Sequence, residues 1–476
     1  MPIPVLSIAQ MRAWEQPTWR SGQTETEVIR RVGKCVAQQA VGLTRAGDLI
    51  LILAGKGHNG DDARLARPHL AERQVQVLDV ADPAKDLPRL EAILSLRPVL
   101  IIDGLFGIGI NRPLSADWTA FIRRINQAQT QVLAVDVPSG LNADTGEPQG
   151  AAIQATVTLA VGAPKAGLLQ PAAWPFVGRL EVATNIGLIP CPEASELNWT
   201  LAADFLRFPP RRPAATHKGS YGHLAIVAGS RGYHGAAVLG ARGAQRAQPG
   251  LITLHTLESV YAVVASQLQA VMVSPWRPGI ELAAGPWDAF LIGPGLASSD
   301  APEELKLLVR RLWTESPLPV IVDASALDWL PPGPIRSSAL RLLTPHPGEA
   351  ARLLGSSAQE VQSNRLHALR TLSKRFGNAW IVLKGHQTLI GRGTGDVFVN
   401  SSGNPHLAQG GSGDVLSGFL GGLLVQPALG ADPLKTIRYA VWQHGATADS
   451  LQVSRLNWVV EDLVEALGST CVAQVR

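Results

Sequence analysis

Cysteine is scarce in this chain of 476 residues, which contains three, Cys35, Cys191 and Cys471. They are far apart and form neither a metal-ligand spacing nor a disulfide framework, a pattern that fits a reducing compartment. A large excess of one charge is also missing, because 42 Lys and Arg oppose 38 Asp and Glu, for a net charge of +4. No long basic run interleaved with aromatic residues occurs, which argues against nucleic acid as a partner.

Long apolar runs are absent as well. No uninterrupted apolar segment is long enough to span a bilayer. Residues 1–7 lack the charged region and apolar core that mark a signal peptide. We therefore expect a cytoplasmic protein with no membrane partner. The sequence also has no G-x-x-x-x-G-K-[ST] motif, so any nucleotide phosphates are not held by a P-loop.

The chain has enough apolar residues for two large cores, since 46% of it is hydrophobic and 17% is charged. In its first part, helix-like segments alternate with continuous apolar runs that are typical of buried parallel strands. These runs lie at 49–54, 75–80, 99–103, 131–136 and 157–161. The alternation predicts a doubly wound α/β domain, in which ligands bind at the carboxyl ends of the strands.

The later part of the chain repeats this alternation with more strands, which predicts a second α/β domain with a larger sheet. Its strand-like runs lie at 224–228, 251–254, 289–292, 320–323, 340–344, 380–383 and 397–400. A proline-rich joint at 189–213 separates the two patterned regions. We therefore predict two domains, residues 1–205 and residues 206–476.

A glycine-rich loop at residues 410–413 precedes Asp414 and an apolar-periodic run. Backbone N–H groups and the positive end of a helix dipole meet at such a loop, which makes an anion site. A carboxylate beside bound phosphate needs another task, and taking a proton from an attacking hydroxyl is one. The simpler interpretation is that Asp414 only caps the helix.

The first strand ends in Gly55-Lys56-Gly57-His58-Asn59-Gly60, which matches G-x-G-x-x-G, and Asp79 stands about where a ribose-binding acid would be. This pattern alone would indicate a nicotinamide dehydrogenase. Asp61 and Asp62 follow directly, however, and Asp103 and Asp136 end neighbouring strands. A pyrophosphate site needs no such extra carboxylates, whereas a monovalent cation or a proton-transfer centre could use them.

These motifs, together with the segments 136–146 and 163–169, resemble the NAD(P)H-hydrate epimerase domain over roughly residues 1–190. The resemblance implies that Asn59, Asp103 and Ser139 bind K⁺ and that Asp136 handles the proton. It also implies that two loops contact the hydrated cofactor. Their residues are His58, Asn59, Gly60, Asp61, Asp62, Gly107, Ile108, Gly109, Ile110, Asn111, Arg112 and Pro113.

The chain departs from that family in two places. The usual Asn-Asn-Gly-Gly-Asp-Gly reads His58-Asn59-Gly60-Asp61-Asp62-Ala63, and the usual Met-Glu pair reads Ile29-Arg30. Asp61 adds a side chain where a ligand should approach closely. An alternative hypothesis is therefore that the N-terminal domain is a non-catalytic scaffold.

Strand ends in the second domain carry further turn chemistry. His346 stands between two prolines, each of which fixes φ, so the loop holds the imidazole in a set place. Lys384-Gly385 ends the next strand and offers a cation and open backbone N–H groups, and Thr388 offers a hydroxyl. This combination suits a nucleotide phosphate or ribose.

In order, the motifs 217–219, 293–295, 344–349, 384–385 and 410–414 resemble the ADP/ATP-dependent NAD(P)H-hydrate dehydratase domain of the ribokinase-like superfamily. The resemblance implies that Asp414 is the base and that the site uses Mg²⁺, which Asp323 and Glu349 are candidates to order through water. The family usually has Asp where this chain has Ser325. The implied ligand contacts are Ala237, Gly295, His346, Lys384, Gly385, His386, Gln387, Thr388, Gly411, Ser412 and Gly413.

Both resemblances together imply a bifunctional cofactor-repair enzyme with a Rossmann-like N-terminal and a ribokinase-like C-terminal domain. The first domain would interconvert the R and S hydrates of NADH and NADPH (NADHX and NADPHX). The second would dehydrate the S form with ADP, giving AMP and phosphate. A homo-oligomer is implied as well. The main alternative is a vitamin or sugar kinase of the same superfamily.

Overall fold

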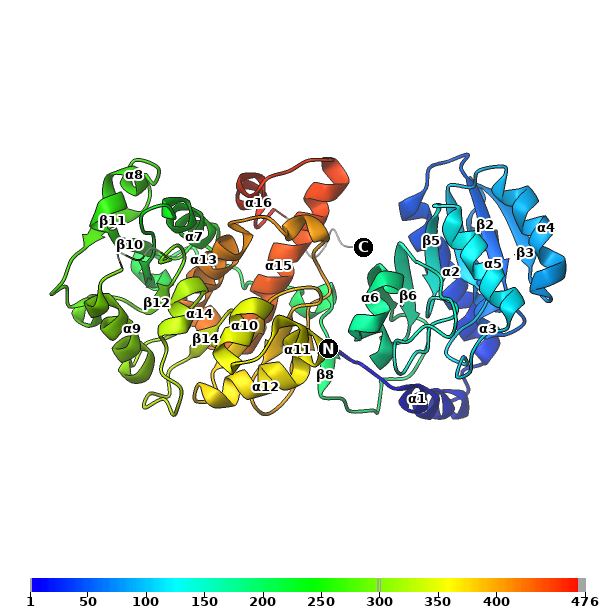
Figure 1. The fold of residues 1–476 in the computed structure, drawn as a ribbon, viewed down its shortest axis with the longest axis horizontal. Helices are drawn as coiled ribbons and strands as arrows, with labels where there is room; N and C mark the ends of the chain where they lie inside the picture. Colours follow the sequence, from blue (N-terminus) through cyan, green and yellow to red (C-terminus); the bar gives the residue numbers. More distant parts are fainter. Residues whose placement is uncertain (1, 298, 300, 470–476) are drawn as a thin grey trace. The chain divides into compact units, whose positions relative to one another are not determined.

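The computed structural model describes residues 2–297, 299 and 301–469, and the chain divides into compact units between Glu196 and Leu197 (Figure 1). This boundary lies before the predicted one at 205/206. Strand β8 (Leu197–Trp199) pairs with β17 (Val397–Val399), and Phe205 is buried in the core of the C-terminal unit. The segment after Glu196 therefore folds with the later part of the chain rather than as a free joint.

The N-terminal unit contains a parallel sheet in the order β3-β2-β4-β5-β6-β7. Its strands are β2 (Leu49–Ala54), β3 (Gln74–Asp79), β4 (Leu100–Gly104), β5 (Gln131–Val135), β6 (Val157–Val161) and β7 (Arg179–Ala183). Its helices are α1 (Ile8–Arg20), α2 (Glu25–Leu43), α3 (His58–Arg64), α4 (Pro83–Leu94), α5 (Ala116–Gln127) and α6 (Trp174–Val177).

Helices cover both faces of this sheet, because successive side chains of a strand point to opposite sides. In β2, Ile50 and Ile52 pack with Val32 of α2 in one core. Leu51 and Leu53 pack with α4 and α5 in the other core. The predicted doubly wound α/β fold is confirmed.

The C-terminal unit has a larger sheet in the order β8-β17-β16-β15-β14-β13-β12-β9-β10-β11. Its pairs are parallel except where β16 runs antiparallel to β15 and β17. Beyond β8 and β17, the strands are β9 (His223–Val227), β10 (Leu251–Leu257), β11 (Met272–Trp276), β12 (Ala289–Ile292), β13 (Val320–Val322), β14 (Arg341–Leu343), β15 (Trp380–Leu383) and β16 (Leu389–Gly391).

The helices of this unit pack against the sheet and against each other. They are α7 (His234–Arg246), α8 (Tyr261–Ala265), α9 (Glu303–Glu315), α10 (Pro347–Leu354), α11 (Ala358–Ser363), α12 (Arg365–Arg375), α13 (Ser412–Leu424), α14 (Pro427–Gly430), α15 (Pro433–Ser454) and α16 (Val460–Ala466). No helix in the described part of the chain is both long and apolar enough to cross a membrane.

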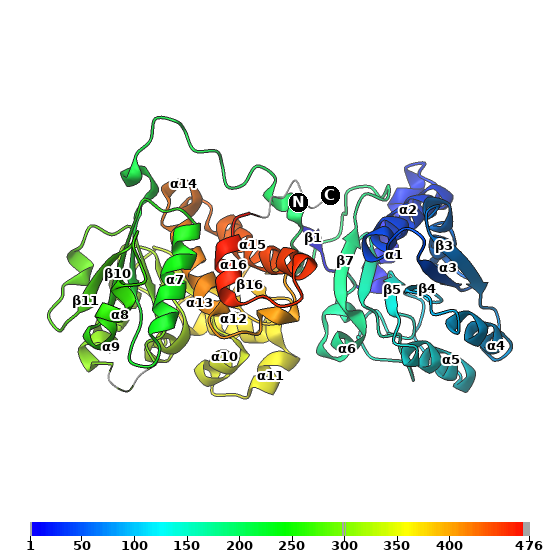
Figure 2. The same cartoon turned by 90° about the horizontal axis from the view of Figure 1, so that it is seen from above.

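Helices α7 and α13 run side by side at very close range (Figure 2). A Cβ on Gly418 would lie 1.9 Å from the Gly240 carbonyl oxygen, and one on Gly243 would lie 2.3 Å from the Val415 carbonyl oxygen. Only glycine permits this backbone contact. The contact fixes the first turns of α13, which follow the glycine-rich loop.

Candidate active sites

Asp414 lies in the first turn of α13, directly after the glycine-rich loop. Gly411 caps the helix with a φ of 96°, in the left-handed region that glycine adopts without steric penalty. A Cβ on Gly411 would lie 2.4 Å from the Leu239 Cδ1 atom. The backbone N–H groups of this first turn and the helix dipole favour an anion beside Asp414.

A cluster of charges faces this helix start from the ends of neighbouring strands. Lys384 Nζ donates to Asp323 Oδ1 at 2.8 Å and lies 3.9 Å from Glu349 Oε2. A Cβ on Gly413 would lie 3.3 Å from the same Nζ. The structure therefore brings Lys384, Gly413 and the two carboxylates together, with four separate segments contributing.

The Asp414 carboxyl holds its proton more tightly than usual. Burial raises its pKa from 3.8 to about 7, the charge of Asp323 adds to the rise, Lys384 opposes it and Glu349 adds to it. Burial lowers the pKa of Lys384, but Asp323, Glu349 and Asp414 outweigh burial and the net pKa is raised. A carboxyl group that titrates near neutral pH is suited to general base catalysis.

His346 is the N-cap of α10. Its Nδ1 accepts hydrogen bonds from the backbone N–H groups of Gly348 at 3.0 Å and Glu349 at 3.4 Å. In return, the Glu349 carboxylate accepts a hydrogen bond from the backbone N–H of His346 at 2.7 Å. This capping box fixes the imidazole, in addition to the two flanking prolines. With Nδ1 accepting, the neutral ring carries its proton on Nε2, 3.5 Å from Glu349 Oε1.

The loop 384–388 has a strained backbone and is fixed by hydrogen bonds from Arg365. Gly385 has a φ of 123° and Gln387 a φ of 51°, and Thr388 Oγ1 donates to the Gly385 carbonyl at 3.0 Å. Arg365 of α12 is buried and donates to the carbonyls of His386 at 2.6 Å and Leu383 at 3.0 Å. The sequence analysis missed Arg365, because nothing in the pattern of α12 distinguishes it from a surface arginine.

Ala237 and Gly295 come from two adjacent segments, the start of α7 and the end of β12. Ala237 is fully buried and packs against Gly229, where an added Cβ would lie 2.8 Å from the Ala237 methyl group. Gly295 has a φ of 67° and accepts from Ser230 Oγ at 2.7 Å through its carbonyl. A Cβ on Gly295 would lie 2.4 Å from the Tyr233 carbonyl oxygen, so this turn requires glycine.

Helix α15 anchors the segment that carries the glycine-rich loop. His444 Nε2 lies 3.0 Å from the Ser412 carbonyl oxygen, and Asp449 accepts from the Gly403 N–H at 2.9 Å. Burial lowers the pKa of His444 to about 4, the Ser412 carbonyl opposes the decrease and Lys384 adds to it. The neutral ring therefore donates to Ser412. The sequence analysis missed His444, although a histidine inside an apolar helix was a usable signal.

In the N-terminal unit, Asn59 and Ser139 both contact the backbone of Phe106, and Asp103 joins them through Ser139. Asp103 is fully buried, and Ser139 donates to it through Oγ at 2.6 Å and through its backbone N–H at 2.8 Å. Asn59 Nδ2 donates to the Phe106 carbonyl at 2.7 Å. Burial raises the pKa of Asp103 to about 6, against the hydrogen bonds from Ser139 and Leu105.

Asp136 follows β5 in an unusual conformation, with a φ of 66°. It forms an ion pair with Lys165, which is fully buried. Lys165 also donates to the Val161 carbonyl at 2.8 Å, and the Val161 N–H donates to Asp136 Oδ1 at 2.9 Å. The sequence analysis gave Lys165 no role, because the two partners are 29 residues apart in the chain.

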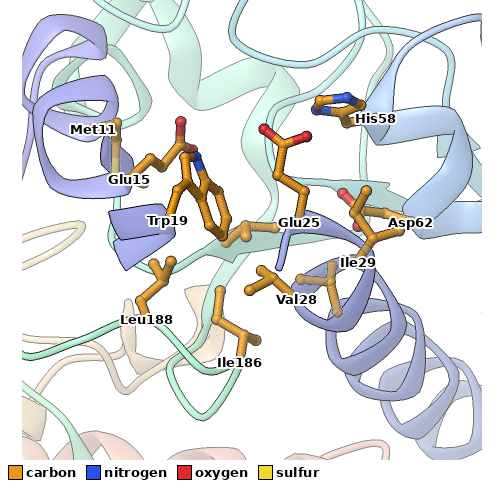
Figure 3. Close-up of a pocket in the computed structure, with 12 residues that line it drawn as sticks. Met11, Glu15, Trp19, Glu25, Val28, Ile29, His58, Asp62, Ile186 and Leu188 are labelled. Carbon is orange, nitrogen blue, oxygen red and sulfur yellow. The ribbon is translucent and has the colours of Figure 1, made fainter. Parts of the chain in front are cut away.

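His58 and Asp62 of α3 line a cavity of about 90 Å³, with Glu15 of α1 and Glu25 of α2 among the other lining residues (Figure 3). Its remaining lining residues are Met11, Trp19, Val28, Ile29, Val32, Val161, Ile186 and Leu188. Asp62 is buried, and its Oδ1 has no hydrogen-bond partner in the described part of the chain. The segment 58–62, expected to be a loop, is the start of helix α3, and it borders a partly acidic cavity.

Asp61 points elsewhere. Arg64 donates to Asp61 Oδ1, to Asp79 Oδ1 and to the Gly55 carbonyl, each at 2.7 Å. A Cβ on Gly60 would lie 2.1 Å from the Gly55 carbonyl oxygen, which explains that glycine. Two acidic residues that the sequence pattern singled out are therefore joined by one guanidinium group.

The loop 107–113 is only partly joined to the other predicted residues. A Cβ on Gly107 would lie 3.4 Å from the Asn59 Cβ atom, and Asn142 Nδ2 donates to the Ile110 carbonyl at 3.4 Å. Gly109, Asn111, Arg112 and Pro113 are exposed, whereas Ile108 is half-buried.

Two family models match the chain. Residues 224–467 match the model described as NAD(P)H-hydrate dehydratase, and residues 78–167 match the YjeF-related protein N-terminus. The chain is 35% identical to the bifunctional NAD(P)H-hydrate repair enzyme Nnr of Gloeobacter violaceus over 98% of this chain and 96% of that protein. It is 34% identical to the protein of the same name from Coxiella burnetii, over 88% of this chain and 89% of that one.

Solved structures resemble the C-terminal unit. A crystal structure of ADP/ATP-dependent NAD(P)H-hydrate dehydratase from Bacillus subtilis, co-crystallized with ATP/Mg²⁺, is 32% identical, with a TM-score of 0.50. It covers 56% of this chain, and the match covers 94% of that chain. A ribokinase-like superfamily protein from Enterococcus faecalis, 23% identical with a TM-score of 0.52, covers 59% of this chain and 97% of its own and shares the fold.

Proposed function

Since the chain belongs to the family of bifunctional NAD(P)H-hydrate repair enzymes, we propose that it restores hydrated NADH and NADPH through two activities. The C-terminal unit dehydrates the S hydrate at the expense of ADP, and the N-terminal unit interconverts the R and S hydrates. The observation that carries the first activity is the position of Asp414, at an anion-binding helix start beside Lys384, with a pKa of about 7. Small molecules are then the substrates, and no nucleic acid or membrane is involved.

In the dehydratase reaction, Asp414 takes the proton of the hydrate hydroxyl as the hydroxyl oxygen attacks the terminal phosphorus of ADP. The bond from this phosphorus to the bridging oxygen breaks, and AMP leaves. N–H groups of Gly411, Ser412 and Gly413 stabilise the transferring group. The phosphorylated hydrate then loses phosphate from one carbon and a proton from the next, which restores the ring double bond.

The loop 384–388 binds the nucleotide in this proposal, with Lys384, Gly385, His386, Gln387 and Thr388 contributing. Arg365 supports the loop through its carbonyls. The hydrate is bordered by Ala237, Gly295 and His346. Ala237 is fully buried and so presents no exposed side-chain surface to it.

Magnesium fits this site as part of a nucleotide complex. No group of three or more His, Cys, Asp or Glu side chains in the described part of the chain could hold a metal ion. Mg²⁺ commonly uses one or two carboxylates plus substrate phosphates and waters, and Asp323 and Glu349 supply carboxylates beside Lys384. The metal would neutralise phosphate charge, a task to which Ser325 adds no carboxylate.

In the N-terminal unit, we propose that Asn59, Asp103 and Ser139 hold K⁺. The ligands of K⁺ would be side-chain oxygens of these residues. Asp103 is a fully buried carboxylate that accepts hydrogen bonds from Ser139 and Leu105. A cation beside it would stabilise its charged form. His58, Asn59, Gly60, Asp62 and Gly107 border the hydrate, and Asp136 handles the proton.

We also propose a cytoplasmic homo-oligomer. Cys35 and Cys191 are free thiols, which supports a reducing compartment. Light scattering of the purified protein measures the oligomeric state directly, and a mass equal to one chain would contradict this proposal.

The decisive experiment supplies purified S and R hydrates of NADH separately, with magnesium and either ADP or ATP, and follows the absorbance of reduced nicotinamide. Rapid recovery from S with ADP supports the dehydratase and identifies the phosphate donor. Recovery from R to a similar extent supports the epimerase, and Asp136→Asn abolishes it. No recovery from either hydrate, with nucleotide turnover on a vitamin alcohol instead, would replace the proposal with a kinase.

A further inference from the structure

We propose that Asp62 is the proton donor of the epimerase reaction and delivers its proton to the hydrate hydroxyl in the cavity between α1, α2 and α3. This inference rests on the proposed function of the N-terminal unit. It gives Asp62 a chemical role beyond contact with the hydrate, and it divides proton transfer between Asp62 and Asp136.

The geometry of Asp62 fits a donor. Its side chain is 8% exposed, it lines the cavity (Figure 3), and its Oδ1 atom has no hydrogen-bond partner among the residues that the structure describes. A buried polar atom without a partner is rare and destabilising. A bound hydroxyl group would satisfy it. The neighbouring Asp61 is excluded from this task, because it pairs with Arg64.

The surroundings of Asp62 favour its protonated form. Burial is the largest cause and raises its pKa well above 3.8, Asp136 and Asp61 raise it further, and Lys165 opposes them. Glu15, Glu25 and His58 also face the cavity. Asp136 differs, since it is ion-paired with Lys165. The two carboxyl groups thus have different partners, since Asp62 faces the cavity and Asp136 faces an ammonium group, and different surroundings are what separate an acid from a base in one reaction.

The reaction balances with these two groups and water. Hydration of an enamine double bond leaves the hydroxyl on the carbon bonded to the ring nitrogen. The Asp62 proton goes to that hydroxyl, the C–O bond breaks and water leaves, and the nitrogen lone pair forms a C=N⁺ bond. Water adds to the other face, its proton passes to Asp136, and the electron pair returns to nitrogen. The other epimer results, with Asp62 ionised and Asp136 protonated. The reverse reaction uses the two groups in exchanged roles, and proton exchange with solvent water restores their starting states.

The cavity also suits the cation formed along the way. Glu15 and Glu25 line it together with Asp62, and Lys165, which acts on Glu15, is buried and paired with Asp136. Carboxyl groups placed where positive charge develops stabilise the transition state. Burial also raises the pKa of Glu15, Lys165 lowers it, and Asp136 and Glu25 raise it further. A cation that forms beside Glu15 would lower this pKa and favour loss of its proton.

The test follows exchange between purified R and S hydrates by chromatography, without nucleotide, for the full-length protein and for buffer alone. Asp62→Asn keeps size and hydrogen bonding but has no acidic proton, and we expect it to slow exchange about 100-fold or more. Asp62→Glu restores part of the rate. Glu72→Gln, which alters a carboxylate 77% exposed on the same unit, leaves the rate unchanged.

Two readouts separate acid catalysis from a structural role. The native rate falls as pH rises through the pKa of Asp62, and Asp62→Asn removes that step from the profile. An infrared difference spectrum between the native protein and Asp62→Asn, recorded at a pH below that step, shows the C=O band of a protonated carboxyl. Native-like exchange in Asp62→Asn, or absence of that band, overturns the proposal while the epimerase stands. A native protein no faster than buffer overturns both.

Discussion

Replacing Asp414 by Asn is expected to stabilise the C-terminal unit while it abolishes the dehydratase. The ionised carboxyl of Asp414 is unfavourable in the folded protein, because burial and the charges of Asp323 and Glu349 raise its pKa to about 7, with Lys384 opposing. Asn has the same shape and no charge. The gain in unfolding free energy should therefore depend on pH in a defined way.

The direction of that dependence follows from proton linkage. Below the unfolded pKa of 3.8, Asp414 is protonated in both states and the two proteins are equally stable. Between 3.8 and about 7, the folded state keeps the proton that the unfolded state has lost, so native stability falls as pH rises. Above about 7, both states are ionised and the difference is constant. The difference between the two pKa values corresponds to about 4 kcal/mol of unfolding free energy. Asp414 is partly exposed, and solvent screening reduces the expected gain to about 2–4 kcal/mol.

Calorimetric unfolding of the full-length protein at several pH values measures this difference. The N-terminal unit provides an internal reference, since its transition should not move. Glu315→Gln is a matched control, because that carboxylate is 51% exposed on the C-terminal unit. The reasoning would be refuted if Asp414→Asn were less stable than the native protein above neutral pH. It would also be refuted if the gain in unfolding free energy were the same at every pH.

Three further outcomes are expected. Gly418→Ala drives a methyl group into the Gly240 carbonyl, which it would approach to 1.9 Å, and should destabilise the C-terminal unit by about 1–3 kcal/mol or more in calorimetry; an unchanged transition would contradict the helix contact. His444→Phe removes the hydrogen bond to Ser412, and kcat of the dehydratase should fall while His444→Gln retains more of it; equal rates for both variants would exclude this positioning role. Ser139→Ala should raise the K⁺ concentration needed for half-maximal epimer exchange, and an unshifted K⁺ titration would remove Ser139 from the ion site.

The sequence predicted the elements whose cause is local. The run 49–54 is strand β2 over the same residues, because a buried parallel strand is apolar throughout. The glycine-rich loop does open helix α13. Strands β7, β11 and β16 were missed, since β7 and β11 alternate with polar or proline residues and β16 is short. Strand β8 was hidden in a segment interpreted as a joint.

The contacts that arrange the sites were harder to predict, because they join residues distant in sequence. Lys165 meets Asp136 and Arg365 meets the 384–388 loop only after the sheets are assembled. His444 reaches Ser412 from another helix. A motif identifies residues that can react or bind a ligand. Their charge and orientation depend on these partners, which come from other parts of the chain.

The contacts of Arg64 have a consequence for how the N-terminal unit can bind a dinucleotide. A dinucleotide site of the usual kind lays the ribose hydroxyls on an acid that follows the second strand. Here Arg64 ties that acid, Asp79, to Asp61 and to the glycine-rich turn at Gly55. Arg64 therefore occupies the acid that such a site offers to a ribose, and a dinucleotide bound in the usual way would have to displace the guanidinium. A hydrated cofactor carries the same ribose as the intact one, so the N-terminal unit has to hold its ligand through contacts other than those of the usual dinucleotide site.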